Sequence, residues 1–250
     1  MKKPSLFEQS RAEFIEKYQD SEVSILWSGG LDSNVLLLLA IEANCKIRLV
    51  TVASQQLPNS EAEEWNRDVV YREIQRMYPD ADMRRVETKS PDMLGGYHLA
   101  QLQMWLIAMM SIHPTDTILV GYVMGDEAVS FIPDIENLWT ALLFNRQYDV
   151  KLAFPLVKAH KEEMQVYVRE RGLTYLNMYC ERPNWSGSGK TGHPVACGVC
   201  PSCLRATNLD RVMYKHDDEV LHIHKPYEVQ PDAEDVEPSV DVYTTEGNVS

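Results

Sequence analysis

Long apolar runs are missing from this 250-residue sequence, which has no uncharged apolar segment of about 18 residues, the length that a membrane-spanning helix needs. The first residues, MKKPSLFEQSRAEF, also lack the apolar stretch of a signal peptide. No segment recurs at a fixed period, which argues against solenoids and propellers. We therefore expect a soluble, cytoplasmic protein with no membrane partner.

Positive charge is scarce, with 24 Lys and Arg against 37 Asp and Glu and a formal net charge of -13. A negative surface repels the phosphate backbone, so we do not expect a nucleic-acid partner. The charge is concentrated in residues 217–250, which hold ten acidic residues and one lysine. Because this segment has few large apolar side chains to bury, we expect it to be a flexible, acidic tail.

Strand-like and helix-like segments alternate along the rest of the chain. The expected strands are 23–27, 46–53, 83–86, 117–122 and 151–154, and the expected helices are 31–43, 60–78, 99–112, 133–145 and 160–171. Such alternation is typical of parallel strands covered by helices on both faces. The sequence therefore predicts an α/β fold with a doubly wound parallel sheet of the Rossmann-like kind, in which ligands bind at the carboxyl ends of the strands.

The stretch SGGLDS directly follows the first expected strand and opens a helix. Two glycines allow a tight turn and a close approach of the backbone to a ligand, and a helix N-terminus favours a phosphate. Serine hydroxyls add donors, whereas Asp32 would repel a phosphate unless it caps backbone N–H groups or holds a metal ion. An ordinary N-capped turn stays open as the alternative. The candidate binding residues are Ser28, Gly29, Gly30, Leu31, Asp32 and Ser33.

Four of the five cysteines form a second pattern, Cys180 followed by Cys197, Cys200 and Cys203. Two overlapping CxxC steps and one upstream thiolate suit tetrahedral Zn(II), and a closed set of four ligands makes the metal structural. An iron–sulfur cluster with the same ligands stays open. The fifth, Cys45, is expected to be a buried core thiol.

These patterns divide the chain into three parts. We expect residues 1–172 to form the α/β domain that carries the SGGLDS turn and residues 173–216 to form a zinc-binding segment packed on it. Residues 217–250 are the acidic tail.

SGGLDS resembles the PP-loop of the ATP pyrophosphatase superfamily, whose members cleave ATP between the α and β phosphates. The resemblance implies a nucleotide-binding enzyme that transfers the adenylyl group to a substrate oxygen. Neither the Walker A ending GK[ST] nor the dinucleotide pattern GxGxxG is present.

The PP-loop together with the late cysteine quartet resembles the 7-cyano-7-deazaguanine synthase family of queuosine biosynthesis. GYVMGD, IPDIENLW and FPLVKAHKEEM agree with family segments in the same order, so the resemblance runs from residue 23 to residue 205. The chain departs from the family around the expected deazapurine pocket, at Ser54, Gln55, Pro58, His98, Leu99 and Ile135.

The family resemblance implies an AMP-forming carbon–nitrogen ligase. Its substrates would be 7-carboxy-7-deazaguanine, ATP and ammonia, its products the amide and then the nitrile, and its metals Mg(II) and structural Zn(II). Asp32 and Ser33 would be catalytic, with Lys161 as a phosphate clamp and Asp126 holding the metal or the purine-like ring. A surface lysine and a helix-capping aspartate are the alternatives for the last two. A homodimer stays open.

Three other functions stay open. The adenylated deazapurine would pass to another amine, such as that of a protein, if the altered pocket admits a different acceptor. A PP-loop tRNA thiolase is disfavoured by the negative charge and by the place of Cys45 behind a helix. A noncatalytic ATP-binding module would keep the loop and the metal without turnover.

Overall fold

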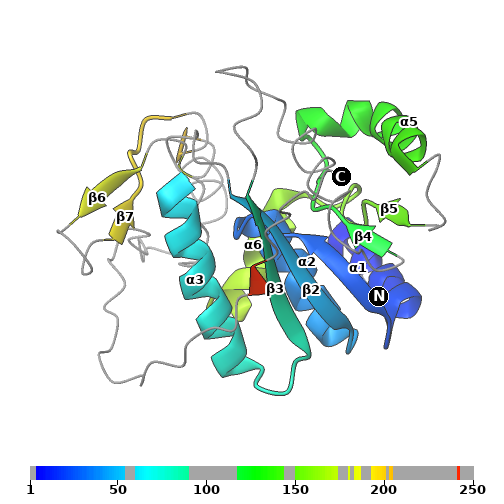
Figure 1. Ribbon diagram of the computed structural model, residues 1–250, viewed down its shortest axis with the longest axis horizontal. Helices are drawn as coiled ribbons and strands as arrows, with labels where there is room; N and C mark the ends of the chain where they lie inside the picture. Colours follow the sequence, from blue (N-terminus) through cyan, green and yellow to red (C-terminus); the bar gives the residue numbers. More distant parts are fainter. Residues whose placement is uncertain are drawn as a thin grey trace, which may run out of the picture.

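The computed structural model describes residues 4–53, 60–89, 117–143, 150–173, 180, 183–186, 193–200, 203–204 and 241–242. Its centre is a six-stranded sheet in the order β5-β4-β1-β2-β3-β8 (Figure 1), and every neighbouring pair is parallel. The strands are β1 Glu22–Leu26, β2 Lys46–Ala53, β3 Met83–Lys89, β4 Thr117–Leu119, β5 Lys151–Ala153 and β8 Asp241–Val242. The order reverses beside β1, so the predicted doubly wound α/β fold is confirmed.

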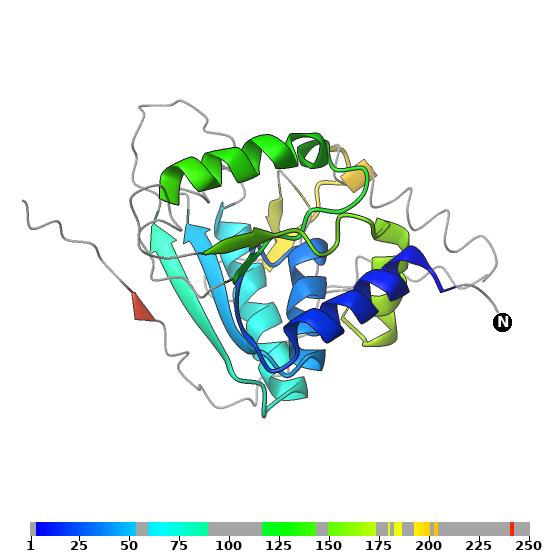
Figure 2. The ribbon, with the colours of Figure 1, turned by 90° about the vertical axis from the view of Figure 1, so that its right-hand side faces the viewer.

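Helices cover the sheet from two directions. They are α1 Leu6–Tyr18, α2 Leu31–Glu42, α3 Ser60–Met77, α5 Ile132–Leu143 and α6 Lys161–Glu170, with the short 3-10 helix η1 Glu127–Phe131 before α5. Figure 2 shows α1, α2, α3 and α6 together on one side of the sheet. Val23 and Ile25 of β1, with Trp27 directly after the strand, belong to the core cluster on that side, whereas Leu26 belongs to a second core cluster with Trp139 of α5. Successive side chains along β1 therefore point to opposite faces of the sheet, and both faces are buried.

Helix α2 is the buried centre of its layer. Its run Val35 to Ala40 is buried throughout, and a helix that is apolar on all sides must be covered on all sides. It packs against β1, β2, α1 and α6. Helix α1 was not predicted from the sequence, although Ser5 and Glu8 form a capping box at its start and could have revealed it.

Several expected elements have shifted ends or lie outside the described residues. Strand β3 runs three residues further than expected, to Lys89, while β4 ends at Leu119. The expected helix 99–112 lies outside the described residues. An antiparallel hairpin of β6 Asn184–Ser186 and β7 His193–Val195 was not predicted.

Two residues of the acidic tail, Asp241 and Val242, pair in parallel with Val86 and Glu87 on the outer edge of β3. The remainder of residues 217–250 lies outside the described part of the chain, so the flexibility of the tail stays a prediction.

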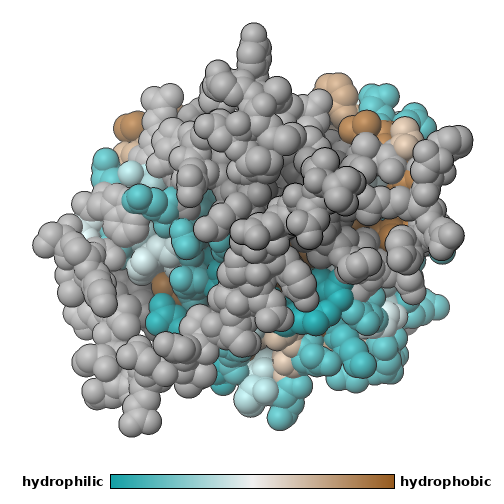
Figure 3. All heavy atoms as spheres, viewed as in Figure 1, coloured by the Kyte–Doolittle hydropathy of each residue, from teal (hydrophilic) through white to brown (hydrophobic). Residues whose placement is uncertain are grey.

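Large apolar side chains are exposed at several places on the described surface, namely at Leu6, Met124, Phe131, Leu138, Val199 and Leu204. Figure 3 shows hydrophobic atoms over α5 at the upper right. Phe131 and Leu138 are the large exposed side chains of η1 and α5. Within the described residues, no helix is long and apolar enough to cross a bilayer.

Candidate nucleotide site and metal centre

The turn after β1 places the SGGLDS stretch at the switch point between β1 and β4. Gly29 has a φ of +80°, and a Cβ added there would lie 2.8 Å from Cγ of Arg67, so both conformation and space require glycine. The Gly29 carbonyl accepts hydrogen bonds from Nδ2 of Asn34 (2.8 Å) and Nδ2 of Asn66 (2.9 Å). The turn is therefore fixed from α2 on one side and from α3 on the other.

The first turn of α2 is built without a side-chain cap. Gly30 occupies the N-cap position and no side chain caps the helix. The Ser28 and Ser33 hydroxyl oxygens lie 3.1 Å apart, and Ser33 donates to the Gly30 carbonyl at 3.1 Å. The ordinary N-capped turn is therefore not what the structure contains. The geometry suits an anion, because a helix start without a capping side chain offers N–H donors and a positive dipole end.

Gly121 closes the other side of this crevice. It follows β4, and a Cβ added there would lie 3.0 Å from the Asp32 carbonyl carbon and 3.2 Å from the Ser33 nitrogen. The chain leaving β4 thus rests directly on the first turn of α2, in line with the ligand position expected for a doubly wound sheet.

The structure brings together three predicted site residues from separate segments. The Lys161 ammonium, at the first residue of α6, lies 3.2 Å from Oδ2 of Asp32 and 2.9 Å from Oδ1 of Asp126. Asp126 also accepts from the Val123 nitrogen at 3.1 Å and makes no side-chain cap of η1. The capping alternative for Asp126 therefore does not hold, and Lys161 is not a plain surface lysine.

Charge in this trio is only partly matched. Burial raises the pKa of Asp32 to about 6; the neighbouring Asp126 also raises it, while Lys161 opposes. Oδ1 of Asp32 is buried and has no hydrogen-bond partner among the described residues. Burial lowers the pKa of Lys161, but the two carboxylates outweigh this effect and hold it above its usual value. Two carboxylates and one ammonium fit an additional cation such as Mg(II), with Asp32 and Asp126 as ligands.

The four predicted metal ligands also come together. The Sγ atoms of Cys180, Cys197, Cys200 and Cys203 lie within 4.8 Å of one another, and those of Cys197 and Cys203 are 3.9 Å apart. A tetrahedral zinc site with Zn–S bonds of about 2.3 Å has sulfur atoms about 3.8 Å apart. Gly198, with a φ of +74°, makes the turn between two of the ligands. The donor set fits Zn(II).

Backbone N–H groups support the thiolates of this cluster. Cys197 donates to the Cys180 sulfur at 3.2 Å, and Cys200 donates to the Cys197 sulfur at 3.4 Å. Backbone donors at residues 199 and 200 lower the pKa of the Cys197 thiol, which favours the metal-binding form. Cys45 is different, because burial raises its pKa to about 11 and its thiol donates to the Tyr18 carbonyl at 3.1 Å. It is a core residue, as expected.

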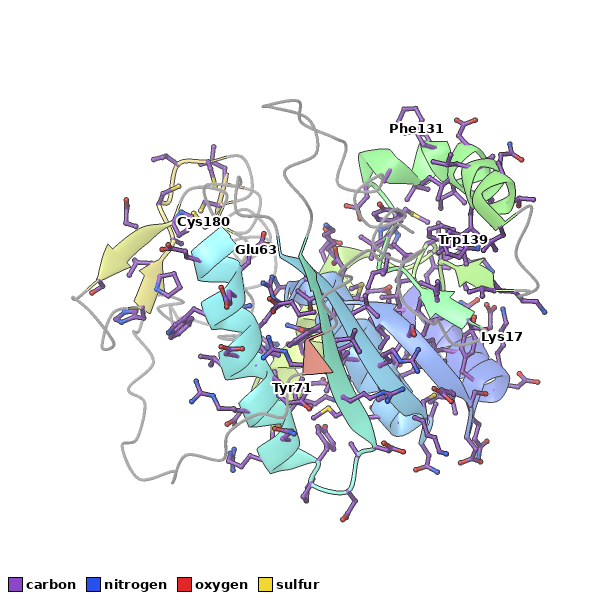
Figure 4. All side chains as sticks on the ribbon, viewed as in Figure 1. Lys17, Glu63, Tyr71, Phe131, Trp139 and Cys180 are labelled. Carbon is purple, nitrogen blue, oxygen red and sulfur yellow. The ribbon has the colours of Figure 1, made fainter. Side chains whose placement is uncertain are left out.

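Helix α3 lies between the cysteine segment and the turn. Strand β7 packs on α3, where the rings of Trp65 and His193 are 6.4 Å apart. Figure 4 shows Cys180 beside the N-terminal end of α3, near Glu63. Asn66 and Arg67, which directly follow Trp65 in α3, contact Gly29. Sequence reasoning missed both, because no motif connects α3 with the turn.

Most of the departures from the synthase family lie outside the described residues, namely Ser54, Gln55, Pro58, His98 and Leu99. Ile135 is described and is a buried residue of α5. It therefore contributes to packing under that helix.

No family model and no curated protein matches the sequence. Among solved structures, the chain is similar to NMN synthetase from Francisella tularensis, at 14% identity and a TM-score of 0.41, over 69% of this chain and 74% of that one. NH3-dependent NAD synthetase from Campylobacter jejuni gives 15% identity and a TM-score of 0.38, over 67% and 72%. A predicted subunit of tRNA methyltransferase from Methanocaldococcus jannaschii gives 13% and 0.34, over 70% and 97%. Likeness at these TM-scores carries no functional argument, so function is inferred from the site itself.

Proposed function

We propose that the protein is an AMP-forming, ATP-dependent ligase of the PP-loop kind that acts on 7-carboxy-7-deazaguanine. The observation that carries the proposal is the junction of β1 and α2, where a helix start with no side-chain cap faces the Asp32–Asp126–Lys161 trio. An anion and a cation are accommodated next to each other there. Magnesium-bound ATP has both.

The residues of the turn would hold the phosphates of ATP. The N–H groups at the start of α2 and the hydroxyls of Ser28 and Ser33 are the donors, and the absence of a Cβ at Gly29 and Gly30 lets the backbone approach closely. Mg(II), when bound, supplies charge neutralisation between the phosphates. Asp32 and Asp126 would hold it, and Oδ1 of Asp32, which has no hydrogen-bond partner within the described part of the chain, is available for that contact.

Lys161 has two roles in this proposal. Its ammonium keeps the two carboxylates close together before ATP arrives. With those carboxylates also able to hold a divalent cation, the Lys161 ammonium would be in a position to contact a phosphate oxygen as well. This positioning is where most of the catalytic effect would arise, since adenylyl transfer depends on orientation and on stabilising developing negative charge.

The proposed reaction has three parts. The substrate carboxylate oxygen attacks the α-phosphorus of ATP, and the bond to the bridging oxygen breaks to release pyrophosphate. Ammonia then attacks the acyl carbon and AMP leaves, giving the amide. The amide oxygen then attacks the α-phosphorus of a second ATP and releases pyrophosphate, after which breakage of the C–O bond releases AMP and loss of the two N–H protons leaves the nitrile. The four cysteines would hold a structural Zn(II) that takes no part in this chemistry. We propose that the enzyme acts in the cytoplasm.

The decisive experiment is mass spectrometry of the products formed from 7-carboxy-7-deazaguanine, ATP and ammonia by the purified protein. We expect the amide or the nitrile, together with AMP and pyrophosphate. If a protein amine becomes labelled while ammonia gives little product, the adenylation stands but the acceptor is wrong. If the carboxylate is never adenylated, the substrate class is refuted.

A further inference from the structure

A second cation touches the turn, and it comes from α3. The side chain of Arg67 is only 4% exposed and lies against Gly29, whose missing Cβ would be 2.8 Å from its Cγ. Asn66, the preceding residue, donates to the Gly29 carbonyl at 2.9 Å. The position of Arg67 relative to the turn is therefore fixed by a hydrogen bond and by close packing.

The charge of Arg67 is poorly matched for a buried guanidinium. Its Nε is buried and has no hydrogen-bond partner among the described residues. Its Nη1 is 3.6 Å from Oε2 of Glu63, too far for a hydrogen bond, and Glu63 is 32% exposed. Burial lowers the pKa of Arg67, with Glu63 and Glu87 opposing. A buried donor without a partner lowers the stability of the fold. Its presence therefore needs an explanation, and binding of a ligand provides one.

Arg85 shows what a structural arginine in the same layer looks like. It is also buried, but its guanidinium is paired with Asp68 and lies over the rings of Trp27 (5.8 Å) and Tyr71 (5.5 Å). The ion pair balances the charge of Arg85 and the two rings pack against its guanidinium, so its burial is explained within the fold. Among the described residues, Arg67 has no comparable set of partners.

Lys161, the other cation near the turn, is already engaged by two carboxylates. A polyphosphate bound there would need a positive group that does not first have to leave Asp32 and Asp126. We propose that Arg67 binds a phosphate oxygen of the nucleotide held at residues 28–33, a role that rests on the proposed function. The ligand class is a pyrophosphate group, because the Arg67 side chain packs against Gly29 of the turn and its buried Nε–H has no acceptor among the described residues.

The test is calorimetric titration of the full-length protein with magnesium pyrophosphate, magnesium ATP and adenosine. Arg67→Met keeps the apolar stem and removes the guanidinium, and Arg67→Lys keeps the charge. Arg72→Met on the exposed face of the same helix is the matched control. We expect Arg67→Met to weaken pyrophosphate and ATP by about ten- to hundredfold, since a hydrogen bond to a charged group is lost, and to leave adenosine unchanged. The control should match the wild type.

A second measurement follows the wild-type protein and needs the conservative variant Arg67→Lys only to assign one resonance. In the wild type, the Nε–H resonance of Arg67, assigned through its loss in Arg67→Lys, should shift when pyrophosphate is added. Wild-type pyrophosphate affinity in Arg67→Met, or no shift of that resonance at saturation, would overturn the role of Arg67 while leaving the proposed function standing. If the wild type binds neither pyrophosphate nor ATP, both proposals are refuted together.

Discussion

The two ends of helix α2 carry charged clusters that differ in how completely they are matched. At the C-terminal end, the Glu42 carboxylate accepts from Arg11 Nε at 2.7 Å, from the Tyr167 hydroxyl at 2.8 Å and from the Arg171 guanidinium. At the N-terminal end, Asp32 faces a second carboxylate and one shared ammonium, and one of its oxygens has no described partner.

The pKa values of the two carboxyl groups follow this difference. Burial raises the pKa of Glu42, but its three donors outweigh burial and hold it below the usual value. Burial raises the pKa of Asp32 to about 6, and Lys161 does not compensate. One helix thus has a fully matched carboxylate at one end and an incompletely matched carboxylate at the other, the end at which we propose that a ligand binds.

The cysteine cluster extends the comparison, because four thiolates this close together carry more negative charge than backbone N–H donors can match, and we propose that a metal ion balances it. We expect one zinc per chain. Cys200→Ser should lose the metal, because it removes one of the four ligands. It should also unfold more easily, because the apparent binding free energy of structural zinc, about 10 kcal/mol or more, contributes to folding. Elemental analysis and thermal unfolding with and without chelator measure this effect. Cys45→Ala is the control and should keep its zinc. Stoichiometric iron with visible absorption would contradict the assignment.

Asp32→Asn tests the unmatched end. We expect AMP formation to fall about a hundred- to thousandfold, comparable with removing one catalytic electrostatic contact. Folding should be unharmed, because the substitution removes a carboxylate whose burial is costly. Chromatographic detection of AMP and thermal unfolding measure the two effects. Glu42→Gln, at the other end of the helix, should keep AMP formation. If Asp32→Asn keeps it as well, the two ends do not differ in function.

Glu42→Ala tests the matched end. Removing this carboxylate leaves Arg11, Arg171 and the Tyr167 hydroxyl without their shared partner, so we expect the free energy of unfolding to fall by about 2 to 3 kcal/mol in urea denaturation. Glu22→Ala is the control, because Glu22 is 52% exposed and its pair with Arg48 at 3.3 Å should contribute below about 1 kcal/mol. Equal losses in the two variants would show that the Glu42 cluster is no stronger than a surface pair.

The sequence reveals these two ends unequally. The N-terminal end is readable because SGGLDS places two glycines, two serines and Asp32 in adjacent positions directly after a strand. Asp126 and Lys161 could be found only by resemblance, since they come from distant segments. The Glu42 cluster draws its partners from α1 and α6 and leaves no local pattern.

Arg67 was missed for a related physical reason. Its importance comes from packing against a glycine 38 positions earlier in the sequence, and a basic residue within an expected amphipathic helix is ordinarily solvent-facing. By contrast, the cysteine ligands were readable because the CxxC spacing constrains their geometry directly. Contacts between elements are what sequence patterns could not supply here.

Acid titration should separate the two ends by the sign of their effects. The folded pKa of Glu42 lies below its usual value of 4.5, so its contribution to stability is present above that pH and is lost as the pH falls through the folded pKa. The folded pKa of Asp32, about 6, lies above 3.8, so its contribution is fully present below pH 3.8 and is lost as the pH rises through 6.

The measurable quantity is the difference in unfolding free energy between the wild type and each neutral variant, from urea denaturation at pH 4 and pH 7.5. Between these values, Asp32→Asn should gain about 1 to 2 kcal/mol relative to the wild type, less than the full shift implies because this carboxylate is partly exposed and lies beside Lys161. Glu42→Gln should lose ground relative to the wild type over the same range, since only the wild type gains an ionised, threefold hydrogen-bonded carboxylate. If the two differences in unfolding free energy change with pH in opposite directions, the same helix must end in one matched and one unmatched carboxylate. Parallel slopes would mean that Lys161 matches Asp32 as fully as the two arginines match Glu42, and the case for a reserved charge at the start of α2 would fail.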